Sequence, residues 1–226
     1  MYDTVLFVAF PYVAVTLAIV MGIYRYYSDR FSYSSLSSQF LENRTLFWGS
    51  VPWHYGVILV LGAHLLAAVF PKLWGDLIAD QIRLYVLEVT GLALALMALI
   101  GLVLLVVRRL TNPRAFAVTS IMDWLLLITL AAQVGLGAWV AFYYRWGSDW
   151  YLHTAVPWML SLVTFNPQIQ HVTALPAVVK WHLLLGFVII GLFPFTRLVH
   201  LVTFPITYLW RPIQVVIWNR RPRTTR

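Results

Sequence analysis

The sequence predicts an all-α integral membrane protein, with residues 1–226 forming a single membrane domain of five transmembrane helices. Hydrophobic residues make up 61% of the chain and charged residues only 11%, and the mean hydropathy is +0.79. Soluble domains have about 45–50% apolar and about 25% charged residues. The apolar residues gather in five segments, each long enough to cross about 30 Å of hydrocarbon as a helix. Their approximate ranges are 4–24, 52–70, 84–107, 121–144 and 178–201.

The first segment, 4–24, has neither the basic start nor the small-residue cleavage site of a signal peptide. We therefore expect it to persist as a transmembrane helix. Pro11 lies inside it and predicts a kink, because proline removes one backbone hydrogen bond. The stretch 25–44 then mixes basic, serine and aromatic residues, which predicts a loop outside the hydrocarbon.

The second span is expected to start at Ser50 and Pro52. Serine is a common helix cap, and proline near the first helical position loses nothing by its missing N–H. Pro71 is expected to end this helix. The third span approaches the membrane through interfacial residues 81–88 and ends before a pair of arginines.

The fourth span is predicted to be capped by Thr119 or Ser120, with Asp123 in its first turn, where a negative charge meets the helix dipole. The connection to the fifth span is the longest in the chain and is rich in Trp and Pro. Within it, residues 158–165 are predicted to form a short helix lying on the membrane interface. The fifth span leads into a basic tail, 202–226, expected in the cytoplasm.

Basic residues predict how the five spans are oriented. Twelve of the sixteen Lys and Arg fall on one side of the membrane and four on the other. Because cytoplasmic loops carry the excess of Lys and Arg, we expect a multi-pass protein of the cytoplasmic (inner) membrane, with its N-terminus outside and its C-terminus in the cytoplasm. The net charge of +8 then follows from membrane orientation, and no nucleic acid is expected as a partner.

Four of the six histidines lie inside predicted spans, two in the second and two in the fifth. His54 and His64 are ten residues apart, and His182 and His200 are eighteen apart. Since these two spans run antiparallel, His54 should meet His200 toward the cytoplasm, and His64 should meet His182 toward the outside. Paired imidazoles from facing helices are typical axial ligands of haem iron. The pattern therefore predicts two b haems between helices 2 and 5.

The spacing of the two histidine pairs is unequal. Ten residues of helix cover about 15 Å and eighteen cover about 27 Å, so about 6 Å must be absorbed at each end. Helix tilt and a kink at Pro194 are expected to absorb this difference. The chain has no cysteine, which excludes cysteine-held iron–sulfur clusters and covalently attached haem. Any cofactor must be held by His, Met or carboxylate, or by nothing covalent.

Glycine and arginine residues near the histidines have two interpretations each. Gly56, Gly62 and Gly186 would leave room for a planar macrocycle, or would let neighbouring helices pack closely. Arg197, three residues before His200, would pair with a haem propionate, or would anchor the helix at the cytoplasmic face.

A haem-free protein is the alternative from a different functional class. A small transporter or proton channel would also place histidines in the membrane, where they would titrate without iron. Four intramembrane histidines at matched depths in two spans favour the haem interpretation. His153 and His171 fall in the outer loop and are expected to have ordinary interfacial roles.

Four motifs point to a known family. They are Ser37-Ser38-Gln39 in the first loop, His54 and His64 at a spacing of ten, Arg108-Arg109-Leu110 after the third span, and Phe193-Pro194-Phe195-Thr196-Arg197-Leu198-Val199-His200 closing the fifth, with His182 eighteen residues earlier. With these motifs the chain resembles the gamma subunit of respiratory nitrate reductase, a five-span cytochrome b that takes electrons from quinol. The resemblance covers essentially the whole chain up to about residue 209.

The resemblance implies that His54 and His200 hold the haem nearer the cytoplasm, and that His64 and His182 hold the haem nearer an outer quinol site. It also implies two cytoplasmic partners, an iron–sulfur subunit and a molybdenum-containing catalytic subunit. The chain would then be the quinol-oxidising subunit of an oxidoreductase and would not act on nitrate by itself. Related cytochrome b subunits of sulfur-metabolism or heterodisulfide-type complexes are the alternative within this chemistry.

Two positions depart from the family pattern. Where the family's quinol site has a lysine at the start of the third span, this chain has Arg83. Its planar guanidinium would bond to a quinone oxygen differently from an ammonium group, and an anchor at the outer face is the alternative role. The glycine that precedes the outer ligand in some relatives is Ala63 here, which would narrow the pocket. The quinol-site candidates are therefore Arg83, His64 and Ala63.

Overall fold

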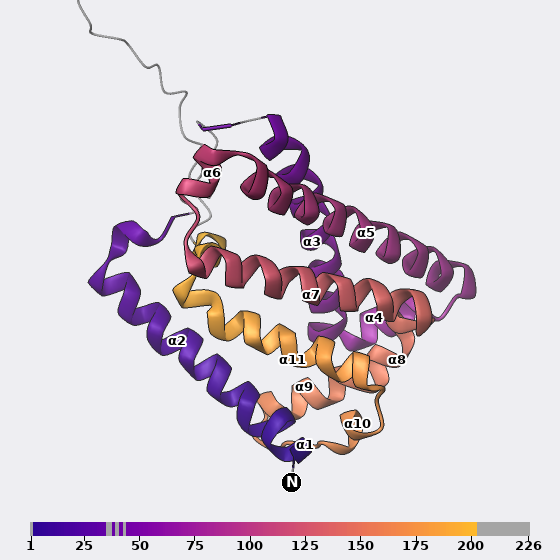
Figure 1. Ribbon diagram of the computed structural model, residues 1–226. Helices are drawn as coiled ribbons and strands as arrows, with labels where there is room; N and C mark the ends of the chain where they lie inside the picture. The colour runs from indigo at the N-terminus through magenta and orange to yellow at the C-terminus, as the bar shows by residue number, and fades with distance from the viewer. Residues whose placement is uncertain (1, 35–37, 39–40, 43, 203–226) are drawn as a thin grey trace, which may run out of the picture.

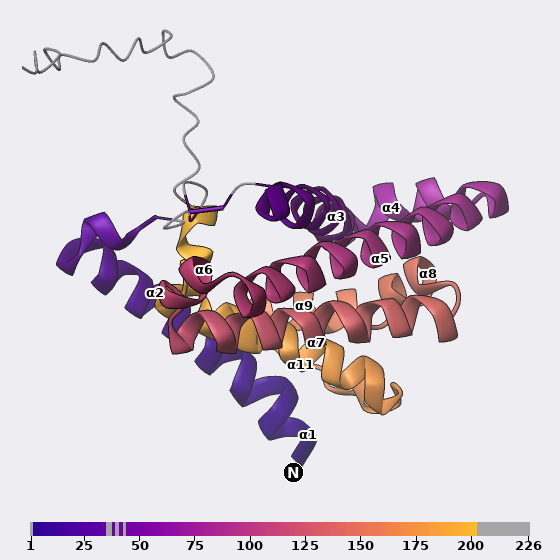
Figure 2. The same ribbon diagram turned by 45° about the horizontal axis from the view of Figure 1, so that its top comes forward.

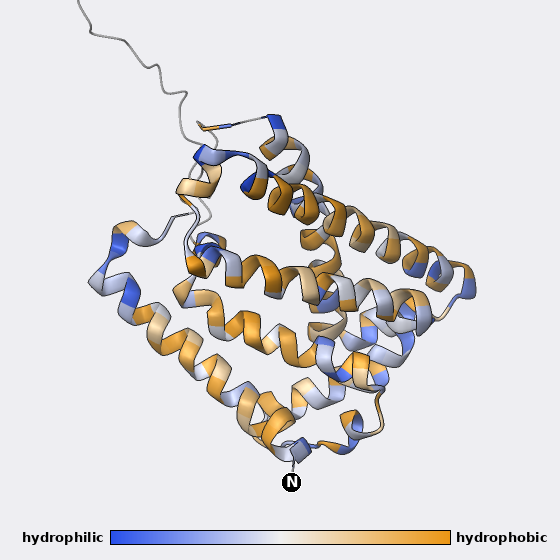
Figure 3. Ribbon diagram, viewed as in Figure 1, coloured by the Kyte–Doolittle hydropathy of each residue, from blue (hydrophilic) through white to orange (hydrophobic). Residues whose placement is uncertain are grey.

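The computed structural model describes residues 2–34, 38, 41–42 and 44–202, and every regular element in that part of the chain is helical (Figure 1). Within the described residues, five helical runs that overlap the predicted ranges are long and apolar enough to cross a membrane. Figure 3 shows apolar residues along these runs and polar residues gathered near their ends. The predicted all-α membrane protein with five spans is confirmed. The predicted basic tail lies outside the described residues apart from Val202.

Spans two to five pack side by side in sequence order, and the first span packs against the fifth (Figure 2). The second span, α3 (Arg44–Val69), packs mainly on the third, α5 (Gln81–Thr111). The fourth span, α7 (Ile121–Tyr143), lies between α5 and the helix of the fifth span, α11 (Ala177–Leu192). On its other side α11 contacts α2 (Phe10–Ser28) of the first span. The two histidine-bearing helices, α3 and α11, therefore have other helices as their main packing partners.

The first span is one helical run that contains a π turn. It consists of α1 (Tyr2–Thr4), the turn Val5–Ala9 and then α2. Pro11 has no N–H to donate to the carbonyl oxygen of Phe7, four residues earlier. That oxygen accepts a hydrogen bond from the indole N–H of Trp158 at 3.0 Å, and both side chains are buried. The irregularity at Pro11 thus docks the first span on the connection before the fifth.

The predicted start of the second span at Ser50 and Pro52 is wrong. The helix α3 begins at Arg44, and Pro52 lies inside it. The carboxylate of Glu42 decides the start, because it accepts hydrogen bonds from the backbone N–H groups of Thr45 and the next residue at 2.7 and 3.3 Å. The first N–H groups of a helix have no partner within it, so such a cap determines where it begins.

Pro71 ends the second span as predicted, and it opens the short helix α4 (Pro71–Ile78). The third span, α5, extends beyond the predicted 84–107 at both ends. Its earlier start follows from Asp80, whose side chain accepts hydrogen bonds from two N–H groups of the first turn, one of them that of Arg83.

The loop between the third and fourth spans is itself helical. Asn112 caps the short helix α6 (Pro113–Ala117) by accepting two backbone hydrogen bonds. The fourth span then starts as predicted, because Ser120 and Asp123 exchange side-chain-to-backbone hydrogen bonds in a capping box.

Three short helices fill the long connection before the fifth span: α8 (Gly147–His153), α9 (Ala155–Val163) and α10 (Gln170–Thr173). The helix predicted over 158–165 is present as α9. Its predicted place on the membrane interface stays a prediction, and within the protein Trp158 is fully buried in a core formed with the first and fifth spans.

The fifth span breaks where a kink is predicted. Its helix α11 ends at Leu192, and two 3₁₀ turns follow, Phe193–Phe195 and Arg197–Leu201, joined by Thr196 in an extended conformation. Pro194 is the cause, since proline cannot donate a backbone hydrogen bond and its ring crowds the preceding turn. Figure 2 shows the end of the described chain, in yellow, leaving the direction of α11.

Small residues let α3 and α5 cross at close range. A β-carbon on Gly101 would lie 2.6 Å from the carbonyl oxygen of Gly49 and 2.6 Å from the backbone nitrogen of Trp53. A β-carbon on Gly56 would lie 2.6 Å from the carbonyl oxygen of Leu94. Helices in a membrane associate largely through such close backbone packing. Gly56 therefore serves close packing, one of its two predicted roles.

Gly101→Ala is expected to lower the thermal unfolding midpoint of the purified protein in detergent. The added methyl group would collide with the backbone of α3, and overpacking of this kind costs about 1–3 kcal/mol. Gly91→Ala in the same helix is the matched control, since nothing among the described residues lies within 4 Å of a β-carbon there. Equal midpoints for the two variants would contradict the close crossing.

Candidate functional site

The first histidine pair predicted from the sequence meets in the structure. The ring centres of His54 on α3 and His200 in the last 3₁₀ turn are 6.3 Å apart, and the ring planes meet at 71°. Two imidazoles bound to opposite sides of one metal ion, through bonds of about 2.0 Å, have ring centres separated by roughly 6 Å. The observed separation therefore fits two ligands of one iron.

The break after α11 explains how this pair can form. Ten residues of regular helix separate His182 from Leu192 at the end of α11, and ten separate His54 from His64. The regular helix is therefore about 15 Å long in both spans. The 3₁₀ turns that follow do not extend α11 further, and they place His200 beside His54.

The second predicted pair is His64 on α3 and His182 on α11, and each ring has its own neighbours. Gly137 on α7 makes room for His182: a β-carbon there would lie 2.9 Å from the imidazole Cε1. On the other side, Tyr151 of α8 packs edge-on against His64 with ring centres 5.2 Å apart. Burial raises the pKa of Tyr151 to about 12, so its phenol stays protonated at neutral pH.

All four histidines share one further contact, a hydrogen bond between Nδ1 and a backbone carbonyl oxygen. His54 and His64 use the carbonyl four residues earlier, at 2.7 and 2.8 Å. His182 uses the carbonyl of Gln133 at 3.0 Å, and His200 uses one within its own turn. A carbonyl oxygen only accepts, so Nδ1 carries the proton and Nε2 carries the lone pair. Metal-ligating histidines are commonly oriented by such a carbonyl partner.

The face of α3 that carries His54 and His64 is exposed. A polar ring facing hydrocarbon is costly, so two exposed imidazoles in an apolar span fit side chains that bind a ligand. A β-carbon on Gly62 would meet nothing among the described residues within 4 Å, which favours the clearance role for this glycine. Gly186 lies in ordinary contact distance, 3.8 Å, of the Gln133 side chain.

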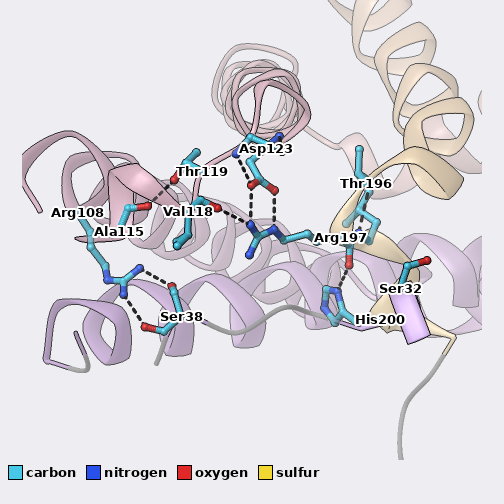
Figure 4. A network of polar contacts seen from close by, with 12 residues as sticks. Ser32, Ser38, Arg108, Ala115, Val118, Thr119, Asp123, Thr196, Arg197 and His200 are labelled. Carbon is cyan, nitrogen blue, oxygen red and sulfur yellow. Dashed lines mark hydrogen bonds and ion pairs between the residues drawn. The ribbon is translucent and has the colours of Figure 1, made fainter. Parts of the chain in front are cut away.

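A polar network lies beside the inner pair (Figure 4). Arg197, predicted to meet a propionate or to act as an anchor, forms a two-pronged ion pair with Asp123 of α7, with Nε to Oδ1 and Nη2 to Oδ2 both at 2.7 Å. Its Nη2 also donates to the carbonyl of Val118 at 3.0 Å. This pairing ties the fifth span to the start of the fourth. Sequence reasoning missed it, because it assigned Asp123 only to the helix cap.

Arg108, fully buried at the end of α5, holds the loop before α3. Its Nε donates to the Glu42 carboxylate at 2.7 Å, and its Nη1 donates to the Ser38 hydroxyl at 2.9 Å. Its Nη2 donates to the backbone carbonyls of the same two residues. Ser38 and Arg108 both belong to family motifs, but their separation of 70 positions in the sequence hides their contact from sequence reasoning.

The neighbouring Arg109 adds positive charge to this region. Its Nε is buried and finds no hydrogen-bond partner among the described residues. Arg108 pairs with Glu42 and Arg197 with Asp123, so Arg109 adds a further positive charge to this cluster of arginines. Such a cluster fits the carboxylates of haem propionates.

The predicted quinol-site residues are only partly brought together. Ala63 packs in a cluster with Tyr151, the residue that contacts His64. The side chain of Arg83 is 53% exposed at the start of α5, and its Nε lies 3.9 Å from Asp80. Its Nη2 donates to a carbonyl of α4 at 3.3 Å. Arg83 therefore contacts the turn between α4 and α5.

The two loop histidines make local polar contacts. His153 lies 3.7 Å from Asp149, and both side chains are largely exposed. These two residues help to line a recess of about 530 Å³ between α4, the start of α5 and α8. His171 forms a hydrogen bond with Gln168 at 3.2 Å.

Known proteins of one kind resemble this chain along nearly its whole length. The family model for the nitrate reductase gamma subunit matches residues 3–219. The nitrate reductase gamma chain of Bacillus subtilis is 33% identical over 215 residues, which cover 93% of this chain and 95% of that one. The respiratory nitrate reductase 1 gamma chain of Escherichia coli is 30% identical over 212 residues, which cover 92% and 93%. The nitrate reductase-like protein NarX of Mycobacterium tuberculosis is 32% identical over 207 residues, 89% of this chain and 32% of that one.

Glu42→Gln is expected to remove a pH-dependent part of the protein's stability. Hydrogen bonds from the Thr45 backbone and from Arg108 hold the pKa of Glu42 below its usual value of 4.5. Such a carboxylate stabilises the fold above its unfolded pKa, and the contribution is lost as the pH falls through the folded value. The variant should therefore unfold at a lower temperature than the wild type at neutral pH, and the two midpoints should converge as the pH falls through the lowered pKa of Glu42.

The control for this comparison is Asp29→Asn, which removes an exposed carboxylate at the end of α2. Its unfolding midpoint should follow the wild type at every pH. A gap between Glu42→Gln and the wild type that stays constant as the pH is lowered through the acid range would show that the carboxylate is not its source.

Proposed function

Because the chain belongs to the nitrate reductase gamma subunit family, we propose that it is the quinol-oxidising membrane subunit of a respiratory nitrate reductase and holds two b haems. Family membership makes it a membrane subunit of an oxidoreductase complex. The observations that support the finer proposal are the contact between His54 and His200 and the arrangement shared by all four histidines, each with Nδ1 bonded to a carbonyl oxygen.

Each pair of histidines would hold one haem. His54 and His200 would ligate the haem beside the arginine cluster, and His64 and His182 the haem at the other end. When bound, haem with two histidine ligands supplies a one-electron carrier without an open position, which suits electron transfer and not nitrate chemistry. Arg109 would neutralise propionate carboxylates next to the inner pair, because its Nε is buried without a partner among the described residues.

The orientation of the protein decides the direction of electron flow. The end that carries Arg25, Arg108 and Arg197 is assigned to the cytoplasm by the positive-inside rule, with the N-terminus outside and the C-terminus inside. A quinol oxidised near His64 would then leave its protons outside while its electrons pass inward. An iron–sulfur subunit would receive them and pass them to a molybdenum-containing subunit that acts on nitrate.

The residues around His64 define the proposed quinol site. Ala63 borders the ligand in sequence, and Tyr151 borders it in space. With its pKa raised to about 12 by burial, the phenol of Tyr151 keeps its proton and can donate a hydrogen bond to a quinone oxygen. Arg83 provides donors at the outer end of α5, where a quinol headgroup would approach from the lipid.

His182→Ala is expected to remove one of two b haems, and His200→Ala the other, because each variant deprives one iron of an axial ligand. The measurement is haem per protein together with the reduced-minus-oxidised absorption spectrum. His153→Ala is the matched control and should keep both haems. A wild-type protein without b-type bands would end the haem proposal in favour of a haem-free channel. Loss of both haems in each single variant would contradict the pairing.

Arg83→Gln is expected to slow reduction of the haems by a quinol analogue about 10-fold or more, the effect of losing a charge-assisted hydrogen bond. Chemical reduction by dithionite should be unaffected, because it does not need the quinol site. Lys72→Gln removes a basic charge from the neighbouring helix α4 and is the control. Equal rates of haem reduction by the quinol analogue in the two variants would instead support the role of Arg83 as an anchor at the outer face.

A further inference from the structure

The break in the fifth span leaves backbone carbonyls without helical partners. Pro194 and Thr196 lie where α11 has ended and the last 3₁₀ turn has not begun. Within a membrane, such carbonyls must find donors elsewhere in the protein. Arg25, in the last turn of α2, supplies them: its Nη1 donates to the Pro194 carbonyl at 2.6 Å and to the Thr196 carbonyl at 3.1 Å. One guanidinium thus serves both carbonyls of the break.

The same guanidinium is held in place from its other edge. Its Nε donates to the Ser32 hydroxyl and its Nη2 to the Ser32 carbonyl, both at 2.8 Å. The ring of Tyr33 lies 5.7 Å away, within the range of a cation–π contact. Arg25 therefore joins the end of α2, the turn Arg30–Ser32 and the break as one hydrogen-bonded unit.

Arg197 follows the break, and its guanidinium bonds to α7, whereas Arg25 belongs to α2. Arg197 pairs with Asp123 of α7, as Figure 4 shows, and its carbonyl accepts the hydrogen bond from His200 Nδ1. The segment from Pro194 to Arg197 is therefore held to α2 by Arg25 and to α7 by its own arginine. The backbone that carries His200 is determined by these two attachments.

We propose that Arg25 is a positioning residue for His200: by bonding to the carbonyls of the broken helix, it determines where the imidazole of His200 faces His54. The inference rests on the proposed function, because it concerns the haem that this pair would hold. Arg25 acts through the backbone of the break, and its described hydrogen bonds go to that backbone and to Ser32.

Arg30 offers a matched comparison at the same end of the first span. It is exposed, and its guanidinium lies over the ring of Tyr26 at 5.3 Å. Arg30→Gln thus removes the same charge from the same region without touching the break. A difference between Arg25→Gln and Arg30→Gln therefore reports on the hydrogen bonds of Arg25 and not on net charge.

The test uses the full-length protein purified with its haems, in two backgrounds that each keep one haem. His182→Ala keeps the inner haem, and His200→Ala keeps the outer one. Adding Arg25→Gln should weaken retention of the inner haem about 10-fold, as loss of a ligand-orienting contact does, and should shift its midpoint potential. The outer haem should keep its occupancy and potential. With Arg25→Lys, retention of the inner haem should lie between that of Arg25→Gln and that of the wild type. An ammonium group also donates hydrogen bonds, but it lacks the planar geometry of the guanidinium.

Each outcome decides the inference. An inner haem with wild-type occupancy and potential in Arg25→Gln would overturn it. Equal loss of the outer haem in the His200→Ala background would also overturn it, because that result indicates a general folding defect. Arg30→Gln should change neither haem, and an effect equal to that of Arg25→Gln would assign the change to charge alone. A wild-type protein without any b haem would instead refute the proposed function, before any Arg25 variant is made.

Discussion

The second and fifth spans each carry two histidines. These histidines can meet in pairs at two depths only if the two histidines of each span are the same distance apart along the helix axis. His64 follows His54 at a spacing of ten residues, whereas His200 follows His182 at a spacing of eighteen. An unbroken fifth helix would place its two imidazoles about 27 Å apart, against about 15 Å on α3. The break at Pro194 removes this difference, since regular helix ends at Leu192. The break also leaves the backbone carbonyls of Pro194 and Thr196 without helical partners, and these need hydrogen-bond donors from other helices.

The polar contacts at the arginine-rich end follow from that break and from the loop before α3. Arg25 serves the carbonyls of the break, Arg197 pairs with Asp123, and Arg108 pairs with Glu42. Buried ion pairs are weak evidence for stability, because removing charges from water costs as much as their attraction returns. Their value in this protein is geometric. They join segments that are far apart in sequence at the end of the protein that holds the inner histidine pair.

Local patterns predicted much of the fold, and they failed where a distant partner decides the outcome. The five spans follow from apolar length alone, and the capping box of Ser120 and Asp123 follows from residue types three apart. The start of α3 was misplaced, because Pro52 is a valid start signal only when no cap lies upstream, and Glu42 provides one. The burial of Trp158 in α9 was not predicted, because its indole N–H donates to a carbonyl 151 residues away.

The sequence by itself determined the class of protein, the number of spans, the family and the four histidines that stand out in apolar helices. Each of these depends on composition or on short-range spacing, which hydropathy and helical periodicity encode directly. Only the tertiary structure decided to which carbonyls Arg25 donates and with which carboxylates Arg108 and Arg197 pair. It also decided that the fifth span breaks, so that a histidine spacing of eighteen can match a spacing of ten. Hydrogen-bond partners and burial depend on which segments meet in space, and no local pattern specifies that meeting.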